Sequence, residues 1–84
     1  MSYYCYILQS EQDGSYYVGS TGNLEERIVR HNRGRYVYTR GKGPWNLVYV
    51  EEHPDRAHAM ERERGIKKRK SKAYIQDLVR TSRP

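Results

Sequence analysis

The sequence has no phenylalanine and only one cysteine, Cys5, among its 84 residues. A single cysteine excludes an internal disulfide and a zinc site built from cysteines, and its apolar neighbours predict a small core residue. Apolar residues make up only 36% of the chain and form no run long enough to span a membrane. The first residues also lack the basic-then-apolar pattern of a signal peptide. We therefore expect a cytoplasmic protein.

Acidic residues are scarce in two stretches where basic residues gather. The chain carries 16 lysines and arginines against 10 aspartates and glutamates, a net charge of +6. Residues 27–42 contain six basic side chains and no acidic one, and residues 62–84 contain nine basic side chains against Glu63 and Asp77. Such clustering indicates a polyanionic partner. We favour a nucleic acid over an anionic membrane surface. A solvated basic surface is the plainer alternative.

Tyrosine takes the place of the missing phenylalanine. The chain has nine tyrosines and one tryptophan, and five of the tyrosines lie within the first 17 residues. A tyrosine ring packs as an apolar group, while its hydroxyl can bond a phosphate or act as a base after losing its proton. We expect most of the nine to pack in the core.

The N-terminal part of the chain predicts a hairpin. Residues 3–9 alternate with no polar face, so they are expected to form a central strand. A turn at residues 12–14 leads back into a second strand over residues 15–19. Residues 19–22, which are small and polar, are expected to form a loop.

A basic amphipathic helix is predicted over residues 23–33. Asn23 followed by Glu26 has the spacing of a capping box at its start, and Gly34 is placed to end it. The next segment, residues 35–44, contains two glycines, a proline and basic side chains, so we expect an ordered but irregular loop.

The second half of the chain predicts a strand over residues 45–52 and then two helices. Pro54 and Asp55 open the first of them, with Asp55 or His53 as its cap. Along it, helical spacing places Glu63 in the middle of an apolar stripe that includes Ala59, Met60 and Ile66. A carboxylate that faces the protein body costs free energy unless a cation, a metal or several donors meet it. Gly65 is expected to mark a close approach to this helix.

The last helix is expected to begin after Ser71 and to cover the sheet with Tyr74, Ile75 and Leu78. The elements together predict one α+β domain over residues 1–84. Its three-stranded, mainly antiparallel sheet is flanked by three helices, in the order strand, strand, helix, strand, helix, helix.

Five short motifs follow one another along the chain. They are Tyr4-Cys5-Tyr6, Tyr17-Val18-Gly19, Arg27-x-x-x-His31, Gly43-Pro44-Trp45 and Glu63-x-x-Ile66-Lys67. In this order and spacing they resemble the GIY-YIG nuclease superfamily, especially its small single-domain bacterial members, over nearly the whole chain. Two departures stand out. Tyr4 and Cys5 replace the glycine and isoleucine of the first motif, and Ser20 stands where some excision-repair relatives carry a lysine.

The resemblance implies a structure-directed endonuclease that hydrolyses DNA phosphodiester bonds in repair or recombination, with Mg²⁺ or Mn²⁺ as cofactor. The implied catalytic residues are Tyr6, Tyr17, Arg27, His31 and Glu63. A tyrosine would help to deprotonate water, Arg27 would steady the phosphate, and Glu63 would bind the metal ion. Either tyrosine remains a candidate for the base. His31 is either a hydrogen-bonding residue of the site or an ordinary surface residue, and Glu63 could instead pair with a core arginine.

Basic residues of both clusters are expected to contact phosphates of the nucleic acid, with DNA favoured over RNA. They are Arg35, Arg40, Lys42, Lys67, Lys68, Arg69 and Lys70. Two other functions fit the same residues. One is a nucleic-acid-binding module without catalysis, and the other is a nuclease subunit whose protein partner supplies target recognition, because 84 residues leave little room for it.

Overall fold

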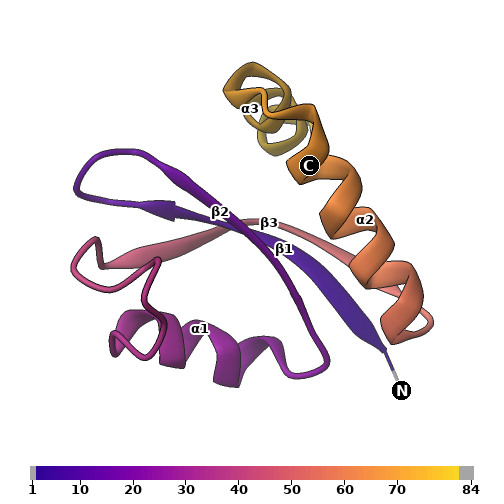
Figure 1. Cartoon of the computed structure of the whole chain (residues 1–84), viewed down its shortest axis with the longest axis horizontal. Coiled ribbons are helices and arrows are strands. Elements are labelled where there is room, and N and C mark those ends of the chain that lie inside the picture. Colours follow the sequence, from indigo (N-terminus) through magenta and orange to yellow (C-terminus); the bar gives the residue numbers. More distant parts are fainter. Residues whose placement is uncertain (1, 82–84) are drawn as a thin grey trace.

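The computed structural model describes residues 2–81, which form one antiparallel sheet and three helices (Figure 1). The elements are β1 (Tyr3–Ser10), β2 (Tyr16–Thr21), α1 (Leu24–Asn32), β3 (Trp45–His53), α2 (Arg56–Arg69) and α3 (Lys72–Thr81). The strands lie in the order β2-β1-β3, and both pairings are antiparallel. The predicted α+β class, the order of the elements and the central position of the first strand are confirmed.

The central strand β1 buries both of its faces because α1 covers one side of the sheet and α2 and α3 cover the other (Figure 1). Cys5 and Ile7 pack with Ile66 of α2, whereas Tyr6 and Leu8 face α1. All four β1 residues have no exposed surface. Burying each large apolar side chain stabilises the fold by about 1.5–3 kcal/mol. The prediction that Cys5 is a core residue is confirmed.

Strand β2 is longer than predicted, because it continues past Gly19 to Thr21. Ser20 pairs with Cys5 and Thr21 with Tyr4 on the central strand, so the ladder of β1 and β2 takes up two residues that were expected in a loop. This correction matters for the site, since it fixes Ser20 on a strand.

The start of α1 is capped in a way that the sequence predicted only in part. The Asn23 side chain accepts a hydrogen bond from the backbone N–H of Glu26 at 3.1 Å. The reciprocal half of the capping box is absent, because the Asn23 N–H donates to Thr21 Oγ1 and the Glu26 carboxylate pairs with Arg30 at 2.7 Å. Gly34, with a φ of +73°, lies just past the helix end as expected.

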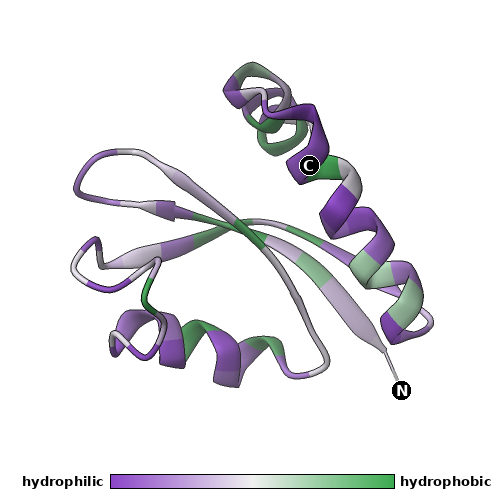
Figure 2. Ribbon diagram, in the orientation of Figure 1, coloured by the Kyte–Doolittle hydropathy of each residue, from purple (hydrophilic) through white to green (hydrophobic). Residues whose placement is uncertain are grey.

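Asp55 and Ser71 cap the two helices on the other side of the sheet, as predicted, and accept from the N–H groups of His58 and Tyr74. Helix α2 buries little of its surface, and Figure 2 shows its ribbon as mostly hydrophilic. Within residues 2–81, no helix combines the length and the apolar character needed to cross a membrane.

The predicted apolar stripe of α2 is narrower in the structure. Ala59 and Ile66 are buried and Glu63 lies between them, half-buried, as predicted. Met60 is exposed, contrary to the prediction, because a residue next to Ala59 is turned about 100° around the helix. Gly65 is also exposed, and no atom lies within 4 Å of a Cβ built on it, so the expected close approach is wrong.

An ion pair between Glu51 and Arg62 joins β3 to α2. Arg62 Nε donates to both carboxylate oxygens at 3.0 Å, and Tyr49 and His53 also hydrogen-bond this carboxylate. Burial raises the pKa of Glu51, but these three hydrogen-bonding partners outweigh it and hold the pKa below its ordinary value. Glu51 is thus the structural partner of an arginine, a role that the sequence left open for Glu63.

Replacing Gly65 with alanine should stabilise the protein. The site is helical and open, so the added methyl group meets nothing, while the unfolded chain loses conformational freedom. We expect the free energy of unfolding to rise by about 0.5–1 kcal/mol in urea denaturation. Gly34→Ala is the matched control and should destabilise, because its φ is +73°. A Gly65→Ala protein no more stable than wild type would contradict this account.

The pairing of Glu51 should make the protein sensitive to acid. The unfolded carboxyl titrates near pH 4.3 and the folded one at lower pH, so its stabilising effect is complete above about 4.3 and is lost as the pH falls through the folded-state pKa. Urea denaturation from about pH 7 to about pH 3 should therefore show a steeper loss of stability for wild type than for Glu51→Gln. Parallel curves for the two proteins would count against it.

Candidate active site

The five side chains that the sequence singled out as catalytic come from four elements and lie near one another. Tyr6 is on β1, Tyr17 on β2, Arg27 and His31 on α1, and Glu63 on α2. The Tyr6 hydroxyl lies 3.0 Å from His31 Nε2, and the rings of Tyr17 and His31 are 4.7 Å apart between centroids. Arg27 and Glu63 are both close enough to influence the ionisation of Tyr6. The structure therefore brings all five into one site.

Gly19 makes room for the two tyrosines. A Cβ built on Gly19 would lie 2.5 Å from the Tyr6 hydroxyl oxygen and 3.1 Å from Tyr17 Cε2. A contact as short as 2.5 Å means that a side chain at this position would force the buried Tyr6 to move. The glycine of the second motif is thus required because β2 passes directly beside the Tyr6 hydroxyl.

His31 is buried, with 1% of its surface exposed, so its interpretation as an ordinary surface residue is wrong. Its Nε2 shares a hydrogen bond with Tyr6, and its Nδ1 lies 2.9 Å from Thr39 Oγ1. Burial, reinforced by the charge of Arg27, lowers the pKa of His31 to about 4. A neutral imidazole has one donor and one acceptor nitrogen, so His31 links the two hydroxyl groups at neutral pH.

The two tyrosines differ in their surroundings. Tyr6 is fully buried, and burial raises its pKa far above the ordinary value, an effect that Tyr17 reinforces and Arg27 partly offsets. Tyr17 is half-buried and lines an open groove of about 570 Å³. Only Tyr17 therefore has a surface that a water molecule or a substrate can reach.

Residues 35–44 cover the site with two tyrosines that sequence reasoning did not assign to it. The Tyr36 ring lies 4.5 Å from His31, and the Arg27 guanidinium stands 5.5 Å from the Tyr36 ring. The Tyr38 ring lies 5.6 Å from Tyr17. Thr39 was missed as well. Tyrosines interleaved with basic side chains are the one signal in the sequence that points to this loop.

Glu63 is held by two donors of the chain itself. Its Oε1 accepts a hydrogen bond from Ser20 Oγ and its Oε2 from Lys67 Nζ, each at 2.6 Å. The side chain of Glu63 keeps 20% of its surface exposed. Ser20, one of the departures from the superfamily pattern, is thus bound to the carboxylate at the centre of the site.

A divalent metal ion fits beside Glu63 only with help from water and substrate. Within residues 2–81, no three His, Cys, Asp or Glu side chains are placed to bind one ion together. Mg²⁺ nevertheless commonly binds through one or two carboxylates and keeps several waters and phosphate oxygens. The Lys67 ammonium, 2.6 Å from Oε2, shows that a cation fits against this carboxylate. A one-carboxylate magnesium site is compatible with these residues.

Two grooves are each lined in part by residues of the site or by residues that contact it. One of about 630 Å³ includes Ser20, Arg27 and Arg56 in its lining, and the groove of about 570 Å³ includes Tyr17 and Lys67. Sequence reasoning did not single out Arg56, although a basic side chain at the start of a helix is a recognisable signal. A strand of nucleic acid that crosses the site would meet cations on both sides of Glu63.

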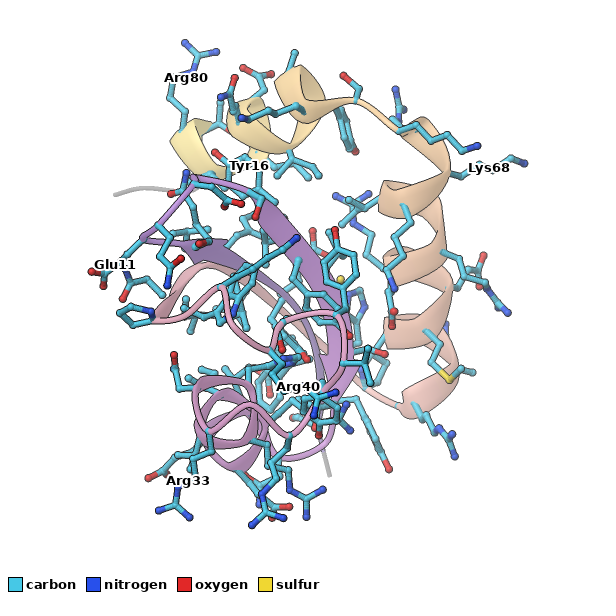
Figure 3. The ribbon with its side chains drawn as sticks, turned by 60° about the vertical axis from the view of Figure 1, so that its left-hand side comes forward. Glu11, Tyr16, Arg33, Arg40, Lys68 and Arg80 are labelled. Atoms are coloured by element: carbon cyan, nitrogen blue, oxygen red, sulfur yellow. The ribbon has the colours of Figure 1, made fainter. Side chains whose placement is uncertain are left out.

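The predicted phosphate-binding residues are spread over several surfaces. Lys67 and Lys70 line the groove beside Tyr17. Arg35 lines a separate groove together with residues of α1, whereas Arg69 stacks on Tyr74, 4.3 Å from its ring. Figure 3 shows Lys68 extending outward from α2, away from the sheet. The remaining two belong to the loop over the site: Arg40 is exposed, and Lys42 stacks on Tyr38 at 4.9 Å.

Comparison with known protein families finds one match that covers most of the chain. The model of the GIY-YIG catalytic domain matches residues 2–76. A UPF0213 protein of Bacillus cereus is 39% identical over 77 residues, which cover 87% of this chain and 80% of the relative. A UPF0213 protein of Clostridium perfringens is 50% identical over 66 residues, covering 77% and 70%. The names of these relatives state no activity.

A solved structure has the same fold. The solution NMR structure of a UPF0213 protein from Bacillus halodurans superimposes with a TM-score of 0.60 at 38% sequence identity. The superposition covers 96% of this chain and 85% of that protein.

His31 should stay neutral until well below neutral pH. Its pKa of about 4 predicts that its ring signals in an NMR titration move only in acid, whereas His58, whose pKa is raised by Asp55, should titrate above 6.5. Because the unfolded His31 binds a proton near pH 6.5, folding stability should decline as the pH falls from there towards 4. A midpoint for His31 near 6.5 would show that the ring is not held as described.

Proposed function

Because the chain belongs to the family of GIY-YIG catalytic domains, we propose that it is a metal-dependent endonuclease that hydrolyses phosphodiester bonds of DNA. The observation that carries the proposal is the convergence of two tyrosines, an arginine, a buried histidine and a half-buried glutamate around the edge strand β2. Hydrolysis of a phosphodiester needs a base for water, a cation for the phosphoryl oxygens and help for the leaving group. The site holds candidates for the first two.

Tyr17 is the better candidate for the base. Its ring lines the groove and is half-buried, whereas the Tyr6 hydroxyl is enclosed and bonded to His31. In this assignment Tyr17 acts in its deprotonated form, and its phenolate oxygen takes a proton from the attacking water. The water oxygen forms a bond to phosphorus while the bond from phosphorus to the leaving oxygen breaks, and the leaving oxygen takes a proton from solvent water. Tyr6 is then a positioning residue, which holds His31 against the Tyr17 ring.

Arg27 is placed to bind the scissile phosphate. Within residues 2–81 its guanidinium forms no ion pair with a carboxylate, and it lines the same groove as Ser20. A guanidinium presents several N–H donors in a plane, which suits the oxygens of a phosphate. Stacking on Tyr36 orients the Arg27 guanidinium and leaves its positive charge unneutralised.

Glu63 would hold the metal ion, with Ser20 as its hydrogen-bonding support. A bound Mg²⁺ or Mn²⁺ would supply Lewis-acid polarisation of the phosphoryl oxygens. The basic side chains in the two grooves would contact the phosphates of the backbone. Phosphate contacts do not distinguish one base sequence from another. We therefore favour a substrate chosen by its structure, such as branched or damaged DNA in repair or recombination.

Cleavage should depend on both the metal and Glu63. We would incubate duplex, single-stranded, flapped and four-way-junction DNA, and RNA, with Mg²⁺ or EDTA, using wild type, Glu63→Gln, Tyr17→Phe and Tyr6→Phe. Glu63→Gln and Tyr17→Phe should each slow cleavage on the order of 100-fold or more, and Tyr6→Phe by less.

The matched control is Glu61→Gln, an exposed glutamate on the same helix, which should cleave as wild type does. Circular dichroism and thermal unfolding establish that each variant is folded. Full activity of folded Glu63→Gln would refute the proposal. DNA that is bound by every variant but never cut would favour a nucleic-acid-binding module instead.

A further inference from the structure

Both oxygens of the Glu63 carboxylate are already occupied by groups of the chain. Ser20 Oγ donates to one oxygen and Lys67 Nζ to the other, each at 2.6 Å. The two donors differ in charge, since the hydroxyl is neutral and the ammonium carries a full positive charge. Lys67 lies one helical turn after Glu63 on α2, and its side chain is 48% exposed. Its long stem leaves the ammonium free to move.

A divalent ion and the Lys67 ammonium cannot share the same carboxylate oxygen without strong repulsion. The repulsion between the ammonium and a divalent ion is twice that between two unit charges at the same separation. The neutral Ser20 hydroxyl has no such conflict and can remain on its oxygen. The ammonium therefore has to leave when a metal ion binds directly to Glu63.

The surroundings of Lys67 indicate where the ammonium goes. Its Nζ lies 5.7 Å from the centroid of the Tyr17 ring, and both side chains line the groove that also includes Tyr38 and Lys70. A short rotation of the stem moves the charge from Glu63 towards Tyr17 and the groove. In that position it would meet a phosphate of the substrate.

We propose that Lys67 is a tethered cation that holds Glu63 in the metal-free protein and is exchanged for the divalent ion when the site is loaded. The exchange sets the metal concentration at which the site fills, and it delivers a positive charge to the Tyr17 side of the site at the same moment. This inference rests on the proposed function, because it takes Glu63 as the metal ligand.

Metal binding without DNA tests the exchange directly. We would titrate the full chain with Tb³⁺ and follow terbium luminescence excited through the nearby tyrosines, and repeat the titration with Mn²⁺ by electron paramagnetic resonance. Removing the competing ammonium in Lys67→Met should lower the apparent Kd about tenfold at low salt, and less at high salt. Lys67→Arg, which keeps the charge, should stay near wild type.

Arg64→Met is the matched control. It removes the same charge from the residue next to Glu63, but Arg64 is exposed and makes no ion pair within the described residues. It should change the apparent Kd by less than about twofold, because the charge is screened by solvent. Equal affinities of wild type and Lys67→Met, with Glu63→Gln unable to bind the ion, would overturn the exchange and leave the metal ligand in place.

Metal binding that does not change in Glu63→Gln would overturn the exchange together with the role of Glu63 in the proposed function. A kinetic readout separates the two parts of the exchange. Lys67→Met should reach half-maximal cleavage at a lower Mg²⁺ concentration than wild type, yet with a lower kcat, because the charge delivered beside Tyr17 is lost. A residue that only stabilises α2 would change neither the magnesium requirement nor kcat in a folded variant.

Discussion

The site depends on one buried hydrogen bond, between the Tyr6 hydroxyl and His31 Nε2. It joins the central strand to α1. It also satisfies the buried Tyr6 hydroxyl, which would cost about 1–3 kcal/mol if it were left without a hydrogen bond. Thr39 completes the chain of hydrogen bonds, and the Thr39 carbonyl accepts from the indole of Trp45. The loop over the site is therefore fastened to the core through the same histidine that positions the tyrosines.

The site lies around the edge strand β2 because this strand presents different residues to the two layers of helices. Tyr17 faces α1 and His31, whereas Val18 and Ser20 face α2, where Ser20 reaches Glu63. A strand in the middle of the sheet would separate the two layers completely. At the edge, Lys67 of α2 can pass around the strand to the Tyr17 ring on the other side.

Periodicity in the sequence predicted the parts of this arrangement that are regular. The strand and helix order and the inward position of Glu63 follow from patterns that repeat every two or about 3.6 residues. The caps at Asn23 and Asp55 follow from the residue types that favour helix starts. The irregular loop, residues 35–44, has no such repeat, so the sequence did not predict that Tyr36 and Thr39 contact His31. The burial of His31 depends on that loop and was undecided for the same reason.

Two glutamates of similar burial show why the number of donors decides what a carboxylate does. Glu51 accepts hydrogen bonds from Arg62, Tyr49 and His53, so removing or moving it would leave several partly buried donors unpaired. Glu63 has one hydroxyl and one exposed ammonium, and such an i, i+4 pair contributes only about 0.3–0.5 kcal/mol. A contact this weak is consistent with the proposed exchange of Lys67 for a divalent ion. In the proposed exchange, Lys67 would neutralise the Glu63 carboxylate while no metal is bound and would still leave it available to a divalent ion. The larger number of donors at Glu51 would not allow this.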